Sequence, residues 1–364
     1  MSKNNILSKF IYGFVKKVLS VEGVKDYTLN NPKRILIIRQ HNQLGDLLAG
    51  VSLFRAIKEK YPDVELTVIL SPANYSGMIK NKFIDNYFIF DKKKIFNPSY
   101  FFKLIKVLRR NYDIVIVPVT VSISFTSNLL SRLAKANLRI GPASLDGKEN
   151  ESAFLFNRRV PINWQAHPDS NVSERSLDIV RPFGISTTNY KSEITFDKKD
   201  TDTALDFIYS LDKKKNELLI GLHPGAGKPQ NRWSLNKYVE LLDRINEKYP
   251  VKFYITGSIK DLEEIDYIKS HSKLTLGIFI NKQIPEVAAL ISKSDIFISN
   301  DTGIMHVAGT TNTPQISIFG PTNPFNWAPI GENKYFIRNS DLIDDVDIDD
   351  VFLLFEHIIN NKKS

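Results

Sequence analysis

The sequence predicts two α/β domains in series, each built on a doubly wound parallel sheet. At 364 residues the chain exceeds one ordinary core, because domains average roughly 150 residues. Short, continuous apolar runs rich in β-branched residues alternate with longer amphipathic segments, the pattern of parallel strands covered by helices on both faces. This alternation stops once near the middle of the chain and then restarts, which indicates two such domains.

Composition supports a folded globular protein. Apolar residues make up 42% of the chain and charged residues 24%, with 17 Gly and 17 Pro. The absence of cysteine excludes disulfides, thiolate metal ligands and a cysteine nucleophile. No stretch reaches the roughly 18 apolar residues that a membrane-spanning helix needs. An integral membrane protein is therefore not expected.

The first domain is expected over residues 1–184. The run Ile35-Leu36-Ile37-Ile38 predicts a buried strand, because four consecutive apolar residues suit a strand covered on both faces. The other elements are predicted from the same alternation. Strands are expected at 35–38, 66–70, 87–90 and 114–119, and helices at 47–60, 100–110 and 126–135.

The polar stretch 185–202 predicts a linker, and the second domain is expected over residues 203–340. Its strands are expected at 218–220, 251–256, 296–298 and 315–319, and its helices at 235–248, 261–270 and 284–292. Residues 341–364 contain an acidic run followed by a helix at about 349–359. We expect this last helix to cross back to the first domain.

Positive charge is concentrated in the N-terminal half. Residues 1–180 hold 27 Lys and Arg against 15 Asp and Glu, a balance of +12, whereas residues 181–364 hold 22 against 25, a balance of −3. Such asymmetry indicates that the first half meets a polyanion: nucleic acid, an anionic membrane surface or a phosphorylated substrate. No nucleic-acid-binding motif is present, so no nucleic acid partner is expected.

Residues 1–30 predict a basic amphipathic lead helix. Apolar pairs recur at a spacing near four, with lysines around them. No small-residue cleavage site follows, so the segment does not predict a secretory signal. Two interpretations remain open: a helix lying in an anionic membrane interface, or a helix packed on its own domain.

Gly45 and Asp46 follow the first predicted strand and open the first long helix. Glycine permits close backbone approach, and Asp46 would stand at the carboxyl edge of the sheet. A carboxylate there is a candidate catalytic base. An Asp at a helix start is also a common N-cap, which is the structural alternative.

A second glycine-bearing segment, containing Gly225, Ala226 and Gly227, follows the strand that opens the second domain. Its exposed amides are candidate ligands for phosphate oxygens. It matches neither the dinucleotide pattern nor the P-loop pattern, since Gln230 and Pro229 occupy the diagnostic positions. Downstream, Arg232 is a candidate to neutralise a diphosphate through its planar fork, or else a solvated surface charge.

A third segment follows the strand at 296–298. Asp301 is placed to take sugar hydroxyls, and the amides of Thr302 and Gly303 to face an anion. His306, flanked by apolar residues, is either part of this site or a core histidine. The loop at 319–324 ends the next strand and lies close by in the predicted sheet.

Three stretches together resemble glycosyltransferase family 9, which contains the lipopolysaccharide heptosyltransferases. They are ILIIRQHNQLGDLL (35–48), GLHPGAGKPQNRWSLNKYVELL (221–242) and SNDTGIMHVAGTTNTPQISIFGPTNPFNWAP (299–329). Their order and spacing agree with the family over about residues 33–335. The D-T-G-x-x-H block followed by F-G-P-T is the specific part.

The resemblance implies a GT-B fold, in which two Rossmann-like domains face a cleft. The acceptor would bind the N-terminal domain and a nucleotide-sugar donor the C-terminal one. Asp46 corresponds to the family's catalytic base. The donor-binding positions correspond to Gly225, Ala226, Arg232, Asp301, Thr302, Gly303 and His306.

The resemblance also implies the reaction: inverting, metal-independent transfer of a sugar, heptose from ADP-heptose, to a lipopolysaccharide-core or related glycolipid. No cofactor and no metal are expected, because the Asp-x-Asp triplets lie in the predicted linker and acidic tail, where solvated charge is the simpler interpretation. The expected partners are the donor, a phosphorylated glycolipid and an anionic membrane surface. The expected location is the cytoplasm, peripheral to the inner face of the bacterial inner membrane.

Three alternatives stay open at this point. The chain could be a GT-B enzyme with another nucleotide-sugar donor, or an epimerase of the same fold. It could also bind a nucleotide sugar without catalysis, or be a plain polyanion-binding module. The sequence does not identify the acceptor, the donor base or the oligomeric state.

Overall fold

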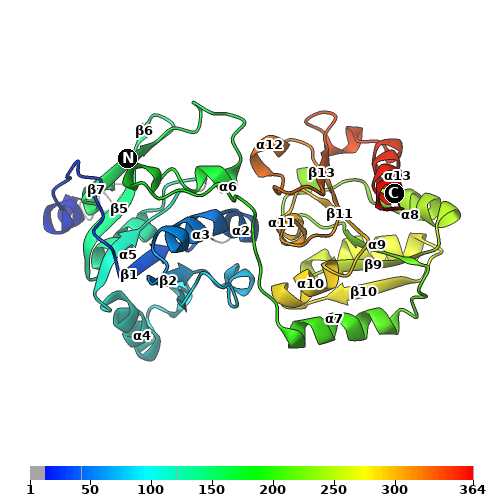
Figure 1. The fold of residues 1–364 in the computed structure, drawn as a ribbon, viewed down its shortest axis with the longest axis horizontal. Coiled ribbons are helices and arrows are strands. Elements are labelled where there is room, and N and C mark those ends of the chain that lie inside the picture. Colours follow the sequence, from blue (N-terminus) through cyan, green and yellow to red (C-terminus); the bar gives the residue numbers. More distant parts are fainter. Residues whose placement is uncertain (1–12, 42, 120, 364) are drawn as a thin grey trace, which may run out of the picture. The chain divides into compact units, whose positions relative to one another are not determined.

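The computed structural model describes residues 13–41, 43–119 and 121–363 (Figure 1). Contacts group them into two compact units. The first unit takes the described parts of Met1–Asn42 together with Gly50–Tyr75 and Lys82–Tyr190. The second takes Gln43–Ala49, Ser76–Asn81 and the described part of Lys191–Ser364. Two short segments that interrupt the first unit along the chain therefore belong to the second.

The first unit is a seven-stranded sheet in the order β3-β2-β1-β4-β5-β6, with β7 also paired to β5. All pairs are parallel except β5 with β6. The strands are β1 Arg34–Ile38, β2 Glu65–Leu70, β3 Asn86–Ile89, β4 Tyr112–Ile116, β5 Ala136–Leu145, β6 Lys148–Glu149 and β7 Arg158–Ile162. Central strand β1 buries four successive residues because helices cover both faces.

The helices of the first unit connect these strands. They are α3 Val51–Lys60, α4 Pro98–Leu108, α5 Phe125–Leu133 and α6 Val172–Arg175, with 3₁₀ turns at η2 Lys92–Lys94, η3 Ala153–Leu155 and η4 Arg181–Phe183. A further turn, η1 Tyr75–Gly77, lies where the chain passes into the second unit. Leu104 and Leu108 of α4 join the core against β1 and β4, which fixes that helix on the sheet.

The predicted lead helix falls partly outside the described residues, which begin at 13. The prediction is wrong beyond residue 19, since the described helix covers residues 13–19 and residues 20–30 are not helical. Phe14 and Val18 on this helix are 63% and 56% exposed. The segment that follows is tied to the first unit, where the Val21 amide donates to the Phe154 carbonyl at 2.9 Å. Whether this helix binds a membrane stays a prediction.

The second unit is a six-stranded, fully parallel sheet in the order β10-β9-β8-β11-β12-β13. Numbered within the unit this order is 3-2-1-4-5-6, that of a dinucleotide-binding Rossmann sheet. The strands are β8 Leu218–His223, β9 Val251–Gly257, β10 Leu276–Ile280, β11 Ile296–Asn300, β12 Gln315–Ile318 and β13 Lys334–Ile337.

Two groups of helices cover this second sheet (Figure 1). Helix α8 contacts α9 and α13, while α10 contacts α7 and α11. Their bounds are α2 Leu44–Ala49, α7 Lys198–Ser210, α8 Leu235–Lys248, α9 Leu262–His271, α10 Ile284–Ile291, α11 Gly303–Gly309, α12 Pro324–Trp327 and α13 Ile348–Lys363, with 3₁₀ turns at η5 Pro229–Asn231, η6 Ile259–Asp261 and η7 Ile343–Asp345.

The last helix does not behave as the sequence predicts. Instead of crossing back to the first domain, α13 packs against α8 and β12 within the second unit. Val351, Phe355 and Ile358 lie buried in the core of that unit. The acidic run ahead of α13 supplies local contacts, as when Asp344 accepts the backbone amide of Ser234 at 2.7 Å.

The predicted linker is wrong at its C-terminal end, because α7 begins at Lys198. The polar residues there form a capping box, in which the Asp197 side chain accepts the Asp200 amide and the Asp200 side chain accepts the Asp197 amide. Asp200 is also buried and paired with Lys80 at 2.6 Å, so it is not a solvated charge. Strands β5, β7, β10 and β13 were not predicted, because polar residues, proline or glycine interrupt or shorten their apolar runs.

The helix expected at 47–60 is two helices, α2 and α3, separated at Gly50. This break has a consequence for the site, since α2 belongs to the second unit and α3 to the first. Among the residues that the structure describes, no helix is both long and apolar enough to cross a membrane.

Candidate functional site

The predicted donor-binding residues gather at one point of the second sheet. β8 and β11 are neighbours, and the strand order reverses between them: β9 and β10 continue to one side, β12 and β13 to the other. Ligands of doubly wound sheets bind outside the carboxyl ends of the strands at such a switch point. The segment beginning at Pro224 leaves β8 there, and Asp301 leaves β11 beside it. The topology therefore explains why Pro224 and Asp301, 77 positions apart, lie at the same place.

The Asn300 side chain connects the segments at this point. Its Oδ1 accepts the Tyr238 hydroxyl at 3.0 Å and the Trp233 amide at 3.3 Å, and its Nδ2 donates to the Pro224 carbonyl at 2.7 Å. Asn300 is fully buried, so these bonds have no competition from water. One amide group thus joins the end of β11 to the loop after β8, to the chain beside Arg232 and to α8.

Asp301 lies among three of the segments singled out in the sequence. Asn231 donates from Nδ2 to Asp301 Oδ2 at 2.8 Å. Burial raises the pKa of the Asp301 carboxyl above its ordinary value, while a hydrogen bond with Thr322 and the charge of Lys228 act to lower it. Thr322 comes from the F-G-P-T loop, so that loop contributes directly to the site.

Arg232 is held in place from two sides. Its Nε donates to the Ala226 carbonyl at 3.0 Å, and its Nη1 pairs with Glu264 Oε1 at 2.7 Å. The side chain is still 38% exposed. Within the described residues its Nη2 has no protein partner, which leaves one edge of the guanidinium open to an anion.

Glu264 is a site residue that the sequence did not reveal. It lies on α9, where two glutamates are adjacent and no motif distinguishes one from the other. Its side chain is 6% exposed, and its second oxygen, Oε2, is buried without a hydrogen-bond partner among the described residues. A buried carboxylate oxygen left unpaired beside a cation is a ready acceptor for ligand hydroxyl groups.

Gly225 is required by packing. A Cβ at this position would lie 2.2 Å from Asp261 Oδ1. Asp261 in turn accepts the Ser258 amide at 2.8 Å, which closes the turn after β9. The absence of a side chain at Gly225 therefore lets the loops after β8 and β9 touch.

Thr302 and Gly303 lie at the start of the short helix α11. Thr302 is the N-cap residue, in extended conformation at φ −151° and ψ 169°, and its side chain makes no capping bond. A Cβ at Gly303 would lie 3.4 Å from Leu44 Cβ and 3.8 Å from the Gly45 nitrogen, an ordinary contact. The starts of α11 and α2 are therefore adjacent.

Asp46, the candidate base, is on α2 and is 5% exposed. Because α2 groups with the second unit and packs on α11, Asp46 belongs to the same compact unit as Asp301 and Arg232. The glycine before it serves this packing: a Cβ at Gly45 would lie 2.6 Å from His306 Cδ2.

The two ends of α11 are fixed differently. His306 is buried against Gly45 and Trp327, and burial lowers its pKa to about 4, so the ring is neutral at physiological pH. Near the C-terminal end of α11, Lys334 Nζ donates to the carbonyl of Ala308, within the helix, at 3.0 Å and to that of Thr313, beyond it, at 2.7 Å. Burial lowers the pKa of Lys334 to about 7. His306 thus supports α2, and donor contact by its ring stays a prediction.

The first unit has a cavity of about 650 Å³ at the carboxyl ends of its own strands. It lies at the switch point between β1 and β4, where Gln40 donates to Ser124 Oγ at 3.0 Å. The lining residues are Gln40, His41, Pro72, Ala73, Phe90, Asp91, Lys92, Lys93, Ser122, Ile123 and Ser124. Burial, with the positive charges of Arg39 and Lys92, lowers the pKa of His41 to about 4. The cavity thus combines a neutral imidazole with two lysines.

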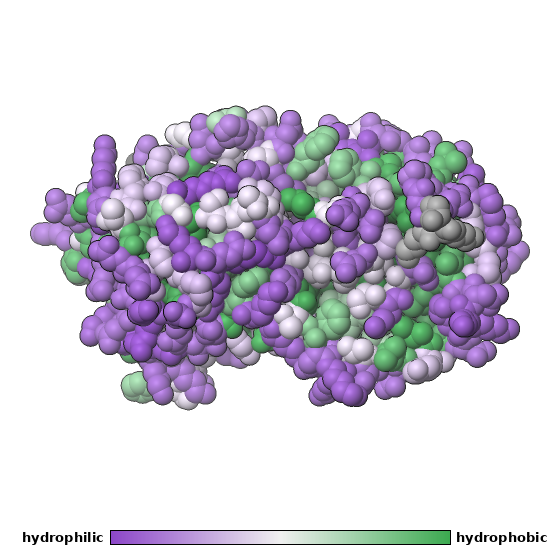
Figure 2. Space-filling view, viewed as in Figure 1, coloured by the Kyte–Doolittle hydropathy of each residue, from purple (hydrophilic) through white to green (hydrophobic). Residues whose placement is uncertain are grey.

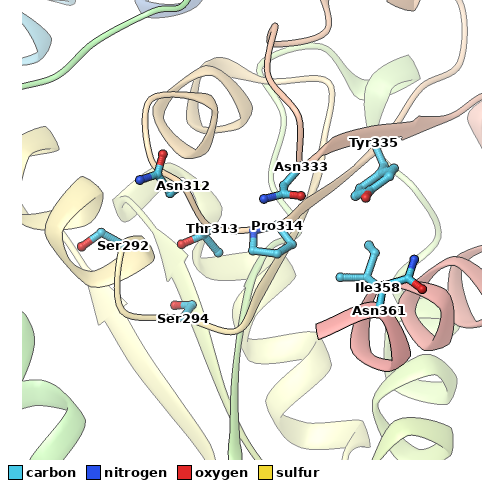
Figure 3. Close-up of a pocket in the computed structure, with 9 residues that line it drawn as sticks. All are labelled: Ser292, Ser294, Asn312, Thr313, Pro314, Asn333, Tyr335, Ile358 and Asn361. Carbon is cyan, nitrogen blue, oxygen red and sulfur yellow. The ribbon is translucent and has the colours of Figure 1, made fainter. Parts of the chain in front are cut away.

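A separate cavity of about 260 Å³ lies at the opposite edge of the second sheet (Figure 3). Thr313, Pro314 and Asn333 line it just before β12 and β13 begin, and Ile358 and Asn361 reach it from α13. The amino ends of parallel strands are not where doubly wound folds place their ligands. We assign it no part in the site.

Comparison with known proteins decides the family. The model of glycosyltransferase family 9 (heptosyltransferase) matches residues 101–349, about two thirds of the chain. The chain belongs to glycosyltransferase family 9. The glycosyltransferase is 27% identical over 302 residues to lipopolysaccharide heptosyltransferase 3 of Escherichia coli, a match covering 79% of this chain and 84% of that protein.

Solved structures agree on the fold. A family 9 glycosyltransferase from Veillonella parvula DSM 2008 superimposes with a TM-score of 0.79 at 17% identity, covering 92% of this chain and 100% of that one. ADP-heptose LPS heptosyltransferase II of E. coli gives 0.73 at 18% identity, covering 91% and 100%. The predicted family, enzyme class and GT-B pair of Rossmann-like domains are confirmed. The roles of the individual site residues stay predictions.

We expect the Asn300 network to dominate the stability of this region. Asn300→Ala leaves the Tyr238 hydroxyl and the Pro224 carbonyl buried without their partner, so the free energy of unfolding should fall by about 3 kcal/mol. Ser299→Ala is the matched control, because the Ser299 hydroxyl is buried without a partner and its removal should cost under ~1 kcal/mol. Urea unfolding of both variants measures this. Equal losses would contradict the assigned role of Asn300.

Proposed function

We propose that this glycosyltransferase transfers heptose from ADP-heptose to a lipopolysaccharide-core or related glycolipid acceptor, with inversion and without a metal ion. The proposed donor binding rests on one observation. Arg232, Glu264 and Asp301 lie together at the switch point of the second sheet. The relatives named above as lipopolysaccharide and ADP-heptose heptosyltransferases supply the sugar, the nucleotide and the acceptor class.

The donor would be bound by ionic contacts to its diphosphate and by hydrogen bonds from its ribose and sugar hydroxyls. The open edge of Arg232 and the exposed Lys228 neutralise the diphosphate. Glu264 Oε2 accepts hydroxyls of the ribose, and its other oxygen keeps Arg232 aimed at the phosphates. The Asp301 carboxylate accepts hydroxyls of the transferred sugar. Gly225, Ala226, Thr302 and Gly303 shape the backbone around the phosphates.

The acceptor would enter the cavity of the first unit. Lys92 and Lys93 give it the positive charge that phosphate groups of a lipopolysaccharide core require. Gln40 and Ser124 offer hydrogen bonds to sugar hydroxyls. The neutral His41 ring, with a buried Nδ1 that has no partner among the described residues, can bond to an uncharged group.

In the proposed reaction an acceptor hydroxyl oxygen attacks the anomeric carbon, the bond from that carbon to the diphosphate breaks, and Asp46 takes the hydroxyl proton. A single displacement of this kind inverts the anomeric centre. Negative charge grows on the leaving ADP, where the fixed guanidinium of Arg232 stabilises it. A protein cation placed there supplies what a divalent ion would otherwise supply.

Product analysis tests this function. Purified protein with ADP-heptose and a heptose-free lipopolysaccharide core should release ADP and add one heptose with inverted anomeric configuration, and turnover should survive EDTA. Mass spectrometry and NMR of the product measure both. Transfer from UDP- or GDP-sugars instead, epimerised nucleotide sugar without transfer, binding without ADP release, or an EDTA loss restored by magnesium would each contradict the corresponding part of the proposal.

Substitutions of the proposed base and of the proposed diphosphate-binding residues should change kcat and the donor KM differently. Asp46→Asn removes the proton acceptor, so kcat should fall by ~10²–10⁴ with the donor dissociation constant nearly unchanged. Arg232→Ala should lower kcat and raise the donor KM, because the guanidinium is proposed to stabilise both the bound diphosphate and the charge that develops on the leaving group. Glu264→Gln should mainly raise the donor KM, with exposed Glu263→Gln on the same helix as the control. An Asp46→Asn variant keeping more than a tenth of the activity would contradict its role as base.

A further inference from the structure

The surface formed by residues 91–110 combines exposed phenylalanines with a dense positive charge. Phe96 is 93% exposed and Phe102 is 72% exposed. The same twenty residues hold seven Lys and Arg and one Asp. Large apolar side chains left this open so close together mark a binding surface more often than chance exposure does. We call residues 91–110 the α4 surface.

Helix α4, which bears Phe102, is held firmly in place. The Asn97 side chain caps α4 by accepting the Tyr100 amide at 3.1 Å, and Pro98 occupies the first turn. The Tyr100 hydroxyl donates to the Ile89 carbonyl of β3 at 2.9 Å, while Leu104 and Leu108 are buried in the core. The outward position of Phe102 is therefore fixed by packing on the opposite side of the helix.

Apolar and basic side chains share the outward face. Phe102, Lys106 and Arg109 are spaced four and three residues apart, which places them on one side of the helix, opposite Leu104 and Leu108. Lys103 and Lys106 have no carboxylate partner among the described residues. In Figure 2 the area over α4 is densely hydrophilic and ends in an apolar patch.

We propose that the α4 surface docks on an anionic lipid bilayer. Phenylalanine side chains enter the boundary between headgroups and acyl chains, and surrounding lysines meet anionic headgroups. A second copy of the chain fits this surface poorly, because two such faces would bring like charges together. Phe96 just before α4 and Phe102 on it supply the apolar contact with a bilayer, and the basic residues of the α4 surface supply the electrostatic one.

The position of this surface connects it to the acceptor. Lys92 and Lys93 belong to the α4 surface and also line the cavity of the first unit. A bilayer docked there lies beside the mouth through which, if the proposed function holds, a lipid-linked acceptor enters. Only this link rests on the proposed function, since docking itself needs no donor and no reaction.

Vesicle flotation of the full-length protein tests the proposal. The protein should bind vesicles of phosphatidylcholine with about one third phosphatidylglycerol, bind pure phosphatidylcholine weakly, and lose binding as salt rises. The F96A/F102A variant should lower the partition coefficient at least tenfold. K103E/K106E should lower it further on anionic vesicles, since each basic residue at such a surface contributes about fivefold.

Matched variants separate the α4 surface from other sites. Y209A/L353A removes two side chains that are 77% and 62% exposed in the second unit, and it should bind as the wild type does. F14A/V18A tests the helix at 13–19. F96A/F102A should unfold in urea at the same midpoint as the wild type, which checks its folding without any reaction. If the proposed function holds, its transfer of sugar to a lipid-free acceptor should also be unchanged.

Three results would overturn the proposal. One is F96A/F102A and K103E/K106E binding anionic vesicles as tightly as wild type. Another is loss of binding in F14A/V18A with binding kept in F96A/F102A. The third is lipid-free self-association, seen by light scattering, that F96A/F102A abolishes.

Discussion

The candidate donor site of this glycosyltransferase depends on one buried amide, that of Asn300. Rossmann sheets bring several loops to one switch point, but loops there lack the repeated backbone bonds that hold strands together. Asn300 supplies the missing connection with both of its polar atoms, joining Pro224, Trp233 and Tyr238 to the end of β11. Arg232 directly precedes Trp233, so the side-chain amide of Asn300 also fixes the backbone position of Arg232.

The second constraint is the close approach of α2 to α11. Gly45 leaves room for the His306 ring, and burial keeps that ring neutral, so no charge is trapped between the helices. The break at Gly50 frees α2 from the longer helix and lets it pack with the second unit. A candidate base encoded early in the chain thus sits in the same compact unit as the donor residues encoded some 200 positions later.

Much of the fold follows from the sequence, because uninterrupted β-branched runs such as Ile35–Ile38 have no stable place except in a covered sheet. The roles of the candidate residues came from the resemblance to glycosyltransferase family 9. The structure places two of them, Arg232 and Asp301, at one switch point. What sequence reasoning missed depends on tertiary contact. Asp197 and Asp200 resembled a solvated linker, since a capping box is visible only once the helix is known to begin there. Glu264 is one of two adjacent glutamates on α9, and only burial distinguishes it.

We propose that the donor diphosphate binds at the switch point of the second sheet, where Glu264 orients Arg232. A crystal structure of the protein with an unreactive fluorinated nucleotide sugar measures this directly. We expect phosphate oxygens about 3 Å from the Arg232 guanidinium and a ligand hydroxyl hydrogen-bonded to Glu264 Oε2. A diphosphate bound elsewhere, with Glu264 Oε2 still unpaired, would contradict it.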